Sequence, residues 1–451
     1  SFDIVFRYLT FLGYKVRYVR NITDVGHLVG DADEGEDKIA KKARLDQLEP
    51  MEVVQKYTNG FRDVMKLFNI LPPSIEPTAT GHIVEQIQFI EEIISNGYAY
   101  EVDGSVYFDV KKYNEDHPYG ELSGRNVEEM MSNTRELAGQ AQKKNQLDFA
   151  LWKKAEKGHL MHWPSPWGEG FPGWHLECSA MSTKYLGQDF DIHGGGMDLK
   201  FPHHEAEIAQ NKGCNNHGGA KYWVHTNMLT VNGRKMAKSE GNGFTPEELL
   251  TGNHKLLERG YSAMTVRFFM LMSHYGSTLD FSNEALQAAE KGYRRLMASV
   301  NLIEKLGPAG TGQIDQTKSD VFKGIIDKTL NDLSDDFNTA KAIASLFEVS
   351  SKINTFYQNP EDLATIDREA FEFTINQFKE IISEVLGLQN ESDDIQDGQL
   401  LSGVMDVLIE LRKQAKFSKN YALSDKIRDD LKTVGVQIKD EKGGDMSFTI
   451  D

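Results

Sequence analysis

The sequence predicts an α/β fold with an inserted β segment in the first half of the chain, followed by an α-helical bundle and a small C-terminal domain. Three observations lead to this prediction. The chain opens with a helical pattern that runs into a short strand, two hairpin signals follow between helical patterns, and from about residue 255 the pattern is helical almost to the end. A helix that leads into a strand is a building unit of α/β proteins.

The size and composition of the chain limit its class. Its 451 residues, 39% of them hydrophobic, can bury two or three cores. No run of about 18 or more apolar residues occurs, so we expect no membrane-spanning helix. Only two cysteines, Cys178 and Cys214, are present, which argues for a reducing compartment, the cytoplasm. A net charge of −18 argues against a general nucleic-acid coat, although a local basic patch can still bind a polyanion.

The first elements of the α/β region are a helix and a strand. Residues 2–12 predict a helix that ends at Gly13, and KVRYV, residues 15–19, predicts a short strand. Because no capping sequence precedes this helix, we expect the chain to start inside a domain, at Ser1. Between about residues 50 and 97, apolar side chains at helical spacing predict helices packed on a sheet.

Two stretches predict β-hairpins. In YAYEVDGSVYFDV, residues 98–110, apolar positions alternate around Asp103-Gly104, which is a good hairpin signal and predicts the inserted β segment. WVHTNMLTVNGRKM, residues 223–236, predicts a second hairpin that is closed by Asn232-Gly233.

Two linkers divide the helical part. GPAGTGQ, residues 307–313, and NESDDIQDGQ, residues 390–399, are rich in turn-forming or acidic residues. We therefore expect domain boundaries near residues 310 and 395.

The stretch FPHHEAE, residues 201–207, is the first candidate for chemistry. His203 and Glu207 are four residues apart, so on a helix they share one face, whereas His204 and Glu205 point elsewhere. Together with a thiolate from Cys178 they suit Zn²⁺. A surface hydrogen bond between His203 and Glu207, with Cys178 a buried apolar residue, is the alternative.

Two further stretches suit a nucleotide. KMAKS, residues 235–239, follows the second hairpin and could swing two lysines onto a triphosphate, although an ordinary solvated loop has the same composition. In DIHGGGMDL, residues 191–199, three glycines permit a close approach of backbone to a nucleotide, and Asp198 could accept hydrogen bonds from ribose hydroxyls. A tight turn packed on the sheet is the alternative there.

Taken together and in this order, these motifs resemble the cysteinyl-tRNA synthetases, a family of class I aminoacyl-tRNA synthetases with a Rossmann-like catalytic domain. The resemblance covers essentially the whole chain, and KMAKS corresponds to the KMSKS loop of class I enzymes with Ala237 in place of a serine. The matching stretches are YVRNITD (18–24), WPSPWGEGFPGWHLECSAMS (163–182), DFDIHGGGMDLKFPHHEAEIAQ (189–210), KMAKSEGN (235–242), FFMLMSHYGSTLDFS (268–282) and DDFNTAKA (335–342).

The resemblance implies a set of site residues. It implies one zinc ion per chain that recognises the thiolate of substrate cysteine, and ATP with Mg²⁺. The family's second cysteine ligand and its HIGH signature lie upstream and do not occur in this sequence, so we expect the chain as printed to be impaired. The implied residues are Cys178, His203 and Glu207 for zinc; Lys235, Lys238 and Ser239 for catalysis; Lys238, His193, Gly194, Gly195, Gly196 and Asp198 for ATP; and Thr23 and Trp174 for the amino acid.

The resemblance also implies four regions and their partners. They are a catalytic domain over 1–240 with an insertion at about 98–175, a stem-contact region over 241–310 that continues the KMSKS loop, a helical-bundle tRNA-binding domain over 311–392 and a small anticodon-binding domain over 393–451. We expect a monomer that binds L-cysteine, ATP and tRNA(Cys).

A basic stretch near the C-terminus supports the tRNA reading. Between Arg412 and Lys432 basic residues outnumber acidic ones, which suggests a phosphate-contacting face, although solvated helix surface would look the same. The family usually has a tryptophan where this chain has Phe448, so anticodon contacts are less certain there. The basic residues are Arg412, Lys413, Lys416, Lys419, Lys426, Arg428 and Lys432, and the acids are Asp425, Asp429 and Asp430.

Three rival functions remain open at this point. A cysteine ligase of the mycothiol pathway shares the catalytic fold and the zinc logic but attaches cysteine to an amino sugar. A zinc-dependent hydrolase would need a general base beside a metal-bound water, for which Glu205 is the only close candidate. A non-catalytic binding module on a synthetase-like scaffold is the third. The helical domain, the stretch DDFNTAKA and the basic tail favour tRNA.

Overall fold

The structure is a computed structural model that describes residues 1–25, 38–127, 142–237, 241–391, 394–418, 420–433, 436–440 and 446–450. The chain divides into two units, Ser1–Leu388 and Gln389–Asp451, and each is described below by itself. Within the ranges given, no helix is both long enough and apolar enough to cross a membrane.

The first helix, α1 (Phe2–Phe11), forms where the sequence predicts it. Ile4 and Tyr8, on one face, are buried, and the helix ends ahead of Gly13, whose φ of +88° favours glycine. The strand predicted at 15–19 is wrong. The chain there is extended but forms only two isolated parallel bridges, Val19 with Ile75 and Ile22 with Thr78. Two bridges three residues apart do not build the continuous ladder of a strand.

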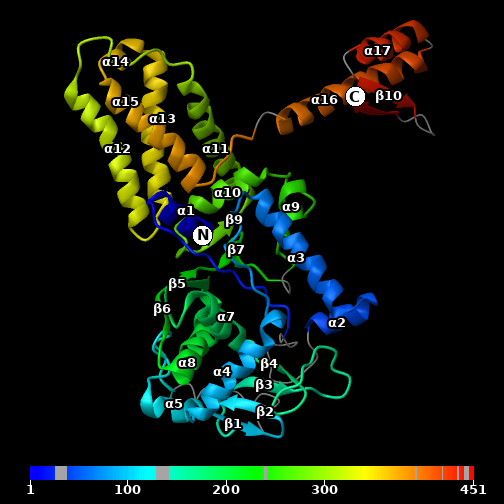
Figure 1. Cartoon of the computed structure of the whole chain (residues 1–451). Coiled ribbons are helices and arrows are strands. Elements are labelled where there is room, and N and C mark those ends of the chain that lie inside the picture. The colour runs from blue at the N-terminus through cyan, green and yellow to red at the C-terminus, as the bar shows by residue number, and fades with distance from the viewer. Residues whose placement is uncertain are drawn as a thin grey trace. The chain divides into compact units, whose positions relative to one another are not determined.

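The helices predicted between residues 50 and 97 are present (Figure 1). Glu49 and Glu52 form a reciprocal capping box at the start of α3, and Pro50 occupies its first turn, where a missing N–H costs nothing. On α4, Phe89, Ile90 and Ile93 face a core that it shares with the inserted sheet. The bounds are α2 (Lys38–Asp46), α3 (Pro50–Leu67), η2 (Thr80–His82) and α4 (Ile83–Ser95).

The inserted β segment is a four-stranded antiparallel sheet in the order β1-β2-β3-β4. Its first two strands are the predicted hairpin, closed by Asp103 and Gly104, both with positive φ. Leu151 and Trp152 of the third strand are fully buried and belong to the core that includes Ile90 of α4. The bounds are β1 (Ala99–Val102), β2 (Ser105–Phe108), α5 (Val110–Asp116), β3 (Phe149–Lys154) and β4 (Gly170–Pro172).

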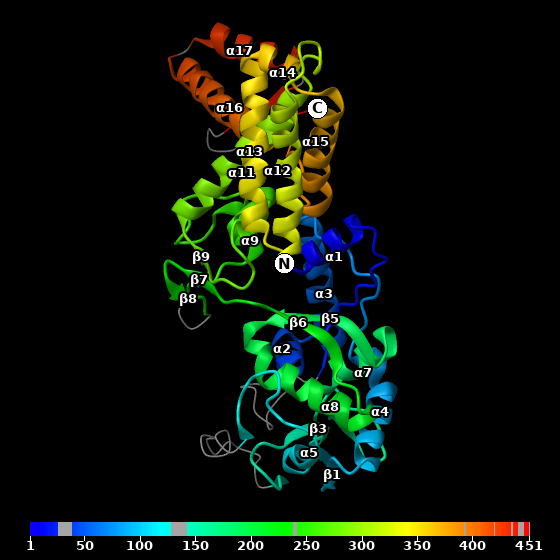
Figure 2. The same cartoon turned by 90° about the vertical axis from the view of Figure 1, so that its left-hand side faces the viewer.

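A parallel β-α-β unit follows. Strands β5 and β6 pair in parallel from Asp189 with Gly219 to Gly196 with Thr226, and α8 makes the crossover between them. Both views of the molecule show α7 and α8 beside this pair of strands (Figures 1 and 2). The bounds are α7 (Leu176–Leu186), β5 (Asp189–Gly196), η4 (Met197–Leu199), η5 (Lys200–His204), α8 (Glu205–Asn215) and β6 (Gly219–Thr226).

The second predicted hairpin is only half right. β7 (Leu229–Val231) and β8 (Arg234–Lys235) are antiparallel around Asn232 and Gly233, both at positive φ, but residues 223–226 belong to β6 in another sheet. The β-structure is interrupted at Asn227, between β6 and β7. The Asn227 side chain accepts from the N–H of Met228 and donates to the carbonyl of Gly276. β7 also pairs in parallel with β9 (Leu279–Phe281), a strand that the helical pattern did not predict.

The rest of the first unit is helical. The helices α11, α12, α13 and α15 stand side by side as a bundle in both views (Figures 1 and 2), around buried Phe322, Leu346 and Phe378. The predicted linker at 307–313 lies between α11 and α12. The bounds are α9 (Pro246–Thr251), α10 (Ala263–Leu271), α11 (Asn283–Ile303), α12 (Gln316–Ser334), α13 (Thr339–Gln358), α14 (Pro360–Ala364), α15 (Arg368–Glu380) and η7 (Ile381–Val385).

The second unit contains two helices and a hairpin. These are α16 (Asp394–Phe417), α17 (Tyr421–Thr433) and the antiparallel strands β10 (Val436–Asp440) and β11 (Met446–Ile450). The linker predicted at 390–399 is therefore wrong from Asp394 onward. Of the predicted basic face, Arg412 is 2% exposed and its Nε donates to the carbonyl of Ser424, so it does not face a phosphate.

Candidate active site and metal cluster

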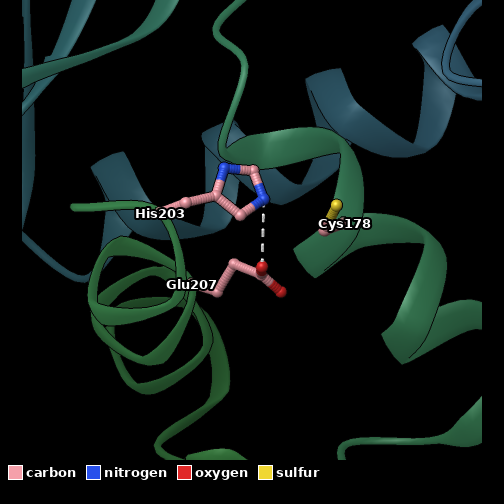
Figure 3. A group of neighbouring side chains, drawn as sticks. All are labelled: Cys178, His203 and Glu207. Atoms are coloured by element: carbon pink, nitrogen blue, oxygen red, sulfur yellow. Dashed lines mark ion pairs between the residues drawn. The ribbon is translucent and has the colours of Figure 1, made fainter. Parts of the chain in front are cut away.

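Cys178, His203 and Glu207 lie on three different elements and converge in the structure (Figure 3). Cys178 belongs to α7, His203 to η5 and Glu207 to the first turn of α8. One ligand atom from each lies within 4.8 Å of those of the other two. The set comprises a sulfur, an imidazole nitrogen and a carboxylate oxygen, which is a donor set that suits Zn²⁺.

Glu207 is the centre of this cluster. Its side chain is 1% exposed, and its Oε1 lies 3.2 Å from Nε2 of His203 and 3.5 Å from Nε2 of His193. This oxygen nevertheless accepts no well-formed hydrogen bond among the described residues. Burial alone would raise the pKa of the carboxyl, but the attraction of His193 and His203 outweighs it and holds that pKa well below its usual range. A buried anionic oxygen without a full set of partners fits a bound cation.

The thiol of Cys178 needs a cation before it can act as a ligand. Burial, and then the negative carboxylates of Glu207 and Glu177, raise the pKa of this thiol well above its usual range. Only the thiolate binds a metal, so binding would release a proton here. Chemically, the three residues fit zinc. Cys214 belongs to no such group among the residues that the structure describes.

His175 supports His203 from the side opposite Glu207. The Nδ1 atoms of these two rings are 2.8 Å apart, while Nε2 of His203 faces Glu207. Burial lowers the pKa of His175 to about 3, so its ring is neutral, and one of the two Nδ1 atoms donates to the other. A ligand histidine is usually oriented by a hydrogen bond at its other nitrogen.

A second group of side chains shares Glu207. Ligand atoms of His193, His204 and Glu207 also lie within 4.8 Å of one another, and Nδ1 of His204 lies 2.8 Å from Nε2 of His225. The prediction that His204 points away is therefore wrong. It assumed α-helical spacing, whereas His204 lies in the five-residue π-turn η5, in which Phe201 has extended backbone angles.

Glu205 is occupied elsewhere. It is 1% exposed, and its two carboxylate oxygens accept from the backbone N–H groups of Ser123, at 2.8 Å, and Leu122, at 3.4 Å. A buried carboxylate that anchors two backbone donors is not available as a general base. This observation disfavours the hydrolase.

Thr23 and Trp174, the predicted amino-acid contacts, both lie beside the cluster. The ring of Trp174 is 4.7 Å from that of His203, centroid to centroid. The hydroxyl of Thr23 donates to Oε1 of Glu177 at 2.9 Å, and Glu177 is the chain neighbour of Cys178. An amino acid held by its side chain at the cluster would thus have an indole face and a hydroxyl within reach.

A side-chain carbon at any of the three glycines at the end of β5 would crowd a neighbouring side chain. A side-chain carbon at Gly194 would lie 2.1 Å from the ring of Phe2, one at Gly195 would lie 2.7 Å from His204, and one at Gly196 would lie 2.3 Å from Oδ1 of Asp198. Asp198 itself is exposed at the end of this strand. The alternative of a tight turn is wrong for the glycines themselves, because all three pair with β6 as the last residues of strand β5. The exposed carboxylate of Asp198 follows them in η4.

The KMAKS stretch is described only in part. Lys235 ends β8 and is exposed, whereas Lys238 and Ser239 lie outside the described residues. Asn242 ties the base of this loop, because its side chain donates to the carbonyl of Lys235 at 3.0 Å and accepts from the N–H of Ala237 at 2.9 Å.

Sequence reasoning did not single out several residues at the site. Asn21, His175, Glu177 and Asn242 each hold a predicted site residue or its backbone in place. All four stand next to, or within three residues of, a predicted site residue. Their partners lie far along the chain or on another element, so spacing alone gave no signal.

Comparison with known proteins identifies the family. Residues 1–291 match the tRNA synthetases class I (C) catalytic domain, and residues 330–390 match the DALR domain. Proteins named cysteine–tRNA ligase from Phocaeicola vulgatus and Cytophaga hutchinsonii are each 56% identical to this chain, with 98% of this chain and 89% of the relative covered.

A solved structure supports the fold. The methionyl-tRNA synthetase of Mycobacterium tuberculosis, in complex with methionyl-adenylate, superimposes with a TM-score of 0.56 at 14% identity, covering 85% of this chain and 84% of that one. The predicted Rossmann-like class I catalytic fold with helices at its C-terminal side is thereby confirmed. The chain belongs to the cysteine–tRNA ligase family of class I tRNA synthetases.

Proposed function

We propose that Cys178, His203 and Glu207 hold one zinc ion per chain, and that this ion selects cysteine by its sulfur. The observation that carries the proposal is the convergence of three different donor atoms around the buried, under-bonded Oε1 of Glu207. When bound, zinc would supply a borderline-soft Lewis acid, which prefers a thiolate to the hydroxyl of serine.

Selection by a metal explains how a single site can distinguish cysteine from amino acids of similar size. An apolar pocket separates substrates that differ by one small group by only about 1–3 kcal/mol. Trp174 and Thr23 would line the site for the rest of the amino acid, an indole face for packing and a hydroxyl for a polar group.

The ATP that reacts with the cysteine carboxylate would be bound next to the metal cluster. Family membership implies ATP with Mg²⁺ as co-substrate. We place ATP against His193, the glycines 194–196 and Asp198, with Lys235, Lys238 and Ser239 acting on its phosphates. Orientation of the cysteine carboxylate against the α-phosphate, together with cationic stabilisation of the leaving pyrophosphate, would supply most of the rate. The activated cysteinyl group then passes to tRNA.

The remainder of the chain would bind tRNA. We assign the acceptor-stem contact to 241–310, a tRNA-binding bundle to 311–392 and anticodon binding to 393–451, in a monomer that acts in the cytoplasm. Lys426 of the second unit is exposed and is therefore a candidate to contact a phosphate of the tRNA. Arg428 instead forms ion pairs with Asp425 and Asp429.

Metal analysis joined to substrate choice tests the proposal. In the protein expressed from its complete gene, we expect one zinc per chain and pyrophosphate exchange that depends on cysteine and not on serine. The Cys178→Ala variant should lose both, and the Cys214→Ala variant should keep both, since Cys214 is the other cysteine and lies outside the cluster. Zinc-free wild-type protein that still rejects serine would overturn the role of the metal.

A further inference from the structure

The stretch that carries Thr23 is fixed along its whole length. Ile22 donates its N–H to the carbonyl of Pro77 at 2.8 Å, and its own carbonyl accepts from the N–H of Ala79 at 3.1 Å. Beyond it, both oxygens of the Asp24 carboxyl accept from Thr80, one from its N–H and one from its hydroxyl. Because side chains of an extended chain alternate, Asn21 and Thr23 project to the same side, toward α7.

The side chain of Asn21 reaches the cluster from there. Its Nδ2 lies 3.5 Å from Sγ of Cys178 and 3.2 Å from Oγ1 of Thr23. An amide nitrogen carries two hydrogens, so both contacts form together. The amide must be oriented this way, because both partners need a donor: Thr23 spends its own hydrogen on Glu177, at 2.9 Å, and a ligating sulfur is a thiolate, which only accepts.

The hydrogen bonds thus start at Asn21 and follow two branches, one to Thr23 and on to Glu177, the other to Cys178. Asn21 donates to Thr23, Thr23 donates to the 2%-exposed Glu177, and the second hydrogen of Asn21 goes to the sulfur next in the chain to Glu177. The Oε1 atom of Glu177 accepts when the carboxyl is charged, and also when the carboxyl is neutral with its proton on Oε2. The sulfur of Cys178 and the hydroxyl of Thr23 are therefore held by one side chain.

We propose that Asn21 is a positioning residue that holds the sulfur of Cys178 and the hydroxyl of Thr23 in register, so that retention of the metal and binding of cysteine depend on the same amide. The inference rests on the proposed zinc site. An N–H donor beside a ligating sulfur orients it and stabilises its negative charge, and loss of such an outer partner typically weakens metal binding by about 10- to 100-fold.

Two substitutions separate electrostatic positioning from simple packing. Asn21→Asp has nearly the same shape but points an anionic oxygen at the sulfur and at Thr23, whereas Asn21→Ala removes the donor without adding repulsion. Measured by competition with a chelator in the full protein, zinc affinity should fall about 10-fold in Asn21→Ala, which only loses the donor, and about 100-fold in Asn21→Asp, which also adds repulsion. The KM for cysteine should rise in both, while kcat and the KM for ATP change little.

Two further variants serve as controls. Thr23→Val cuts the link to Thr23 and leaves the N–H to sulfur contact, so it should raise the KM for cysteine without releasing zinc. Asn96→Asp removes an asparagine that likewise donates to two acceptors, the carbonyls of Gly213 and Cys214, and should leave zinc affinity unchanged.

The outcomes separate this inference from the proposed function. Wild-type protein without zinc defeats the metal site, and the role of Asn21 with it. Wild-type protein that binds zinc, with Asn21→Asp binding it equally well at an unchanged Tm, defeats the role of Asn21 alone. If Asn21→Asp melts early, the smaller Asn21→Ala change decides the question by the same two measurements.

Discussion

Glu205 separates two chemistries at the scale of one residue. The Glu205→Gln variant should keep its zinc and its cysteine-dependent exchange, because the carboxylate serves the N–H groups of Leu122 and Ser123 and not the reaction. It should lower the free energy of unfolding by about 1–3 kcal/mol, as expected when the charge-assisted hydrogen bonds of a buried carboxylate are weakened. Denaturant unfolding and metal analysis of the same preparation check this.

A surface glutamate provides the matched control. The exposed carboxylate of Glu121 pairs with Lys212. The Glu121→Gln variant should therefore have a free energy of unfolding only about 0–1 kcal/mol lower than that of the wild type. A Glu205→Gln protein of normal stability that has lost its activity would restore the hydrolase or another role in which Glu205 acts on substrate.

The site residues divide by how far their partners lie along the chain. Residue type and four-residue spacing led to His203 and Glu207, and the preference of a thiolate for zinc led to Cys178. Nothing local marks Asn21 or His175, because their contacts, Cys178 and His203, lie on other elements. His204 was misplaced because a π-turn replaces the regular α-helix that the spacing argument assumed.

At the scale of elements, pattern succeeded where one segment determines its own structure. The turn at Asp103-Gly104 and the periodic face of α1 needed no distant partner. Strand pairing did need one. Residues 15–19 have the composition of a strand, but their neighbour, residues 74–79, offers bridges only at Ile75 and Thr78, and β9 is visible only once β7 lies beside it.

Glu76 holds the segment of Asn21 and Thr23 to the rest of the domain. Its carboxylate accepts from Arg20 at 2.6 Å and from Arg62 at 2.6 Å. Burial would raise the pKa of this carboxyl, but the two guanidinium hydrogen bonds outweigh burial and hold that pKa below its ordinary value of 4.5. The folded state therefore favours the charged form.

The stability that Glu76 provides should depend on pH in a defined direction. A carboxyl whose pKa is lowered by folding stabilises the protein fully above its unfolded pKa, and this contribution is lost as the pH falls from there through the lower, folded pKa. Glu76→Gln should cost about 1–2 kcal/mol at pH 7, since solvent partly screens Arg62, and much less at pH 3. Unfolding curves of both proteins at the two pH values measure this, and a difference that grows toward acid would contradict it.

At the scale of the first unit, one buried group of charges joins the α/β region to the helical bundle. Asp3 of α1 accepts from Arg7 at 2.9 Å and from Arg267 of α10 at 2.5 Å. The two guanidiniums also donate to the carbonyls of Glu384 and Leu386, at the end of the bundle. A side chain at the next glycine, Gly387, would meet Nη2 of Arg267 at 2.4 Å, so glycine is what lets the chain approach.

The second positive charge in this group is balanced by backbone oxygens. One carboxylate faces two guanidiniums, which also contact carbonyls at two helix ends, where a helix carries partial negative charge. These are the carbonyls of Glu384 and Leu386 at the end of η7 and those of Phe68 and Asn69 at the end of α3. Burial, more than any neighbour, lowers the pKa of Arg267, yet the residue stays charged because its ordinary pKa is so high. No sequence pattern predicted this group, since Asp3 and Arg267 lie 264 residues apart along the chain.

We therefore expect Arg267→Met to lower the stability of the protein and its affinity for tRNA more than it impairs the activation of cysteine. It leaves Asp3 with Arg7 as its one ion-pair partner, beside the N–H of Leu71, and leaves the carbonyls of Phe68 and Leu386 without the guanidinium donor. This loss should cost about 3–5 kcal/mol. Because the bundle is the proposed tRNA-binding region, the KM for tRNA should rise more than the KM for cysteine in pyrophosphate exchange.

Arg294→Met, which removes an exposed partner of Glu290, is the control. It should lower the free energy of unfolding by about 0–1 kcal/mol and leave both KM values unchanged. Equal effects of the two substitutions on Tm, or a larger effect of Arg267→Met on cysteine than on tRNA, would show that the buried charges do not couple the two regions.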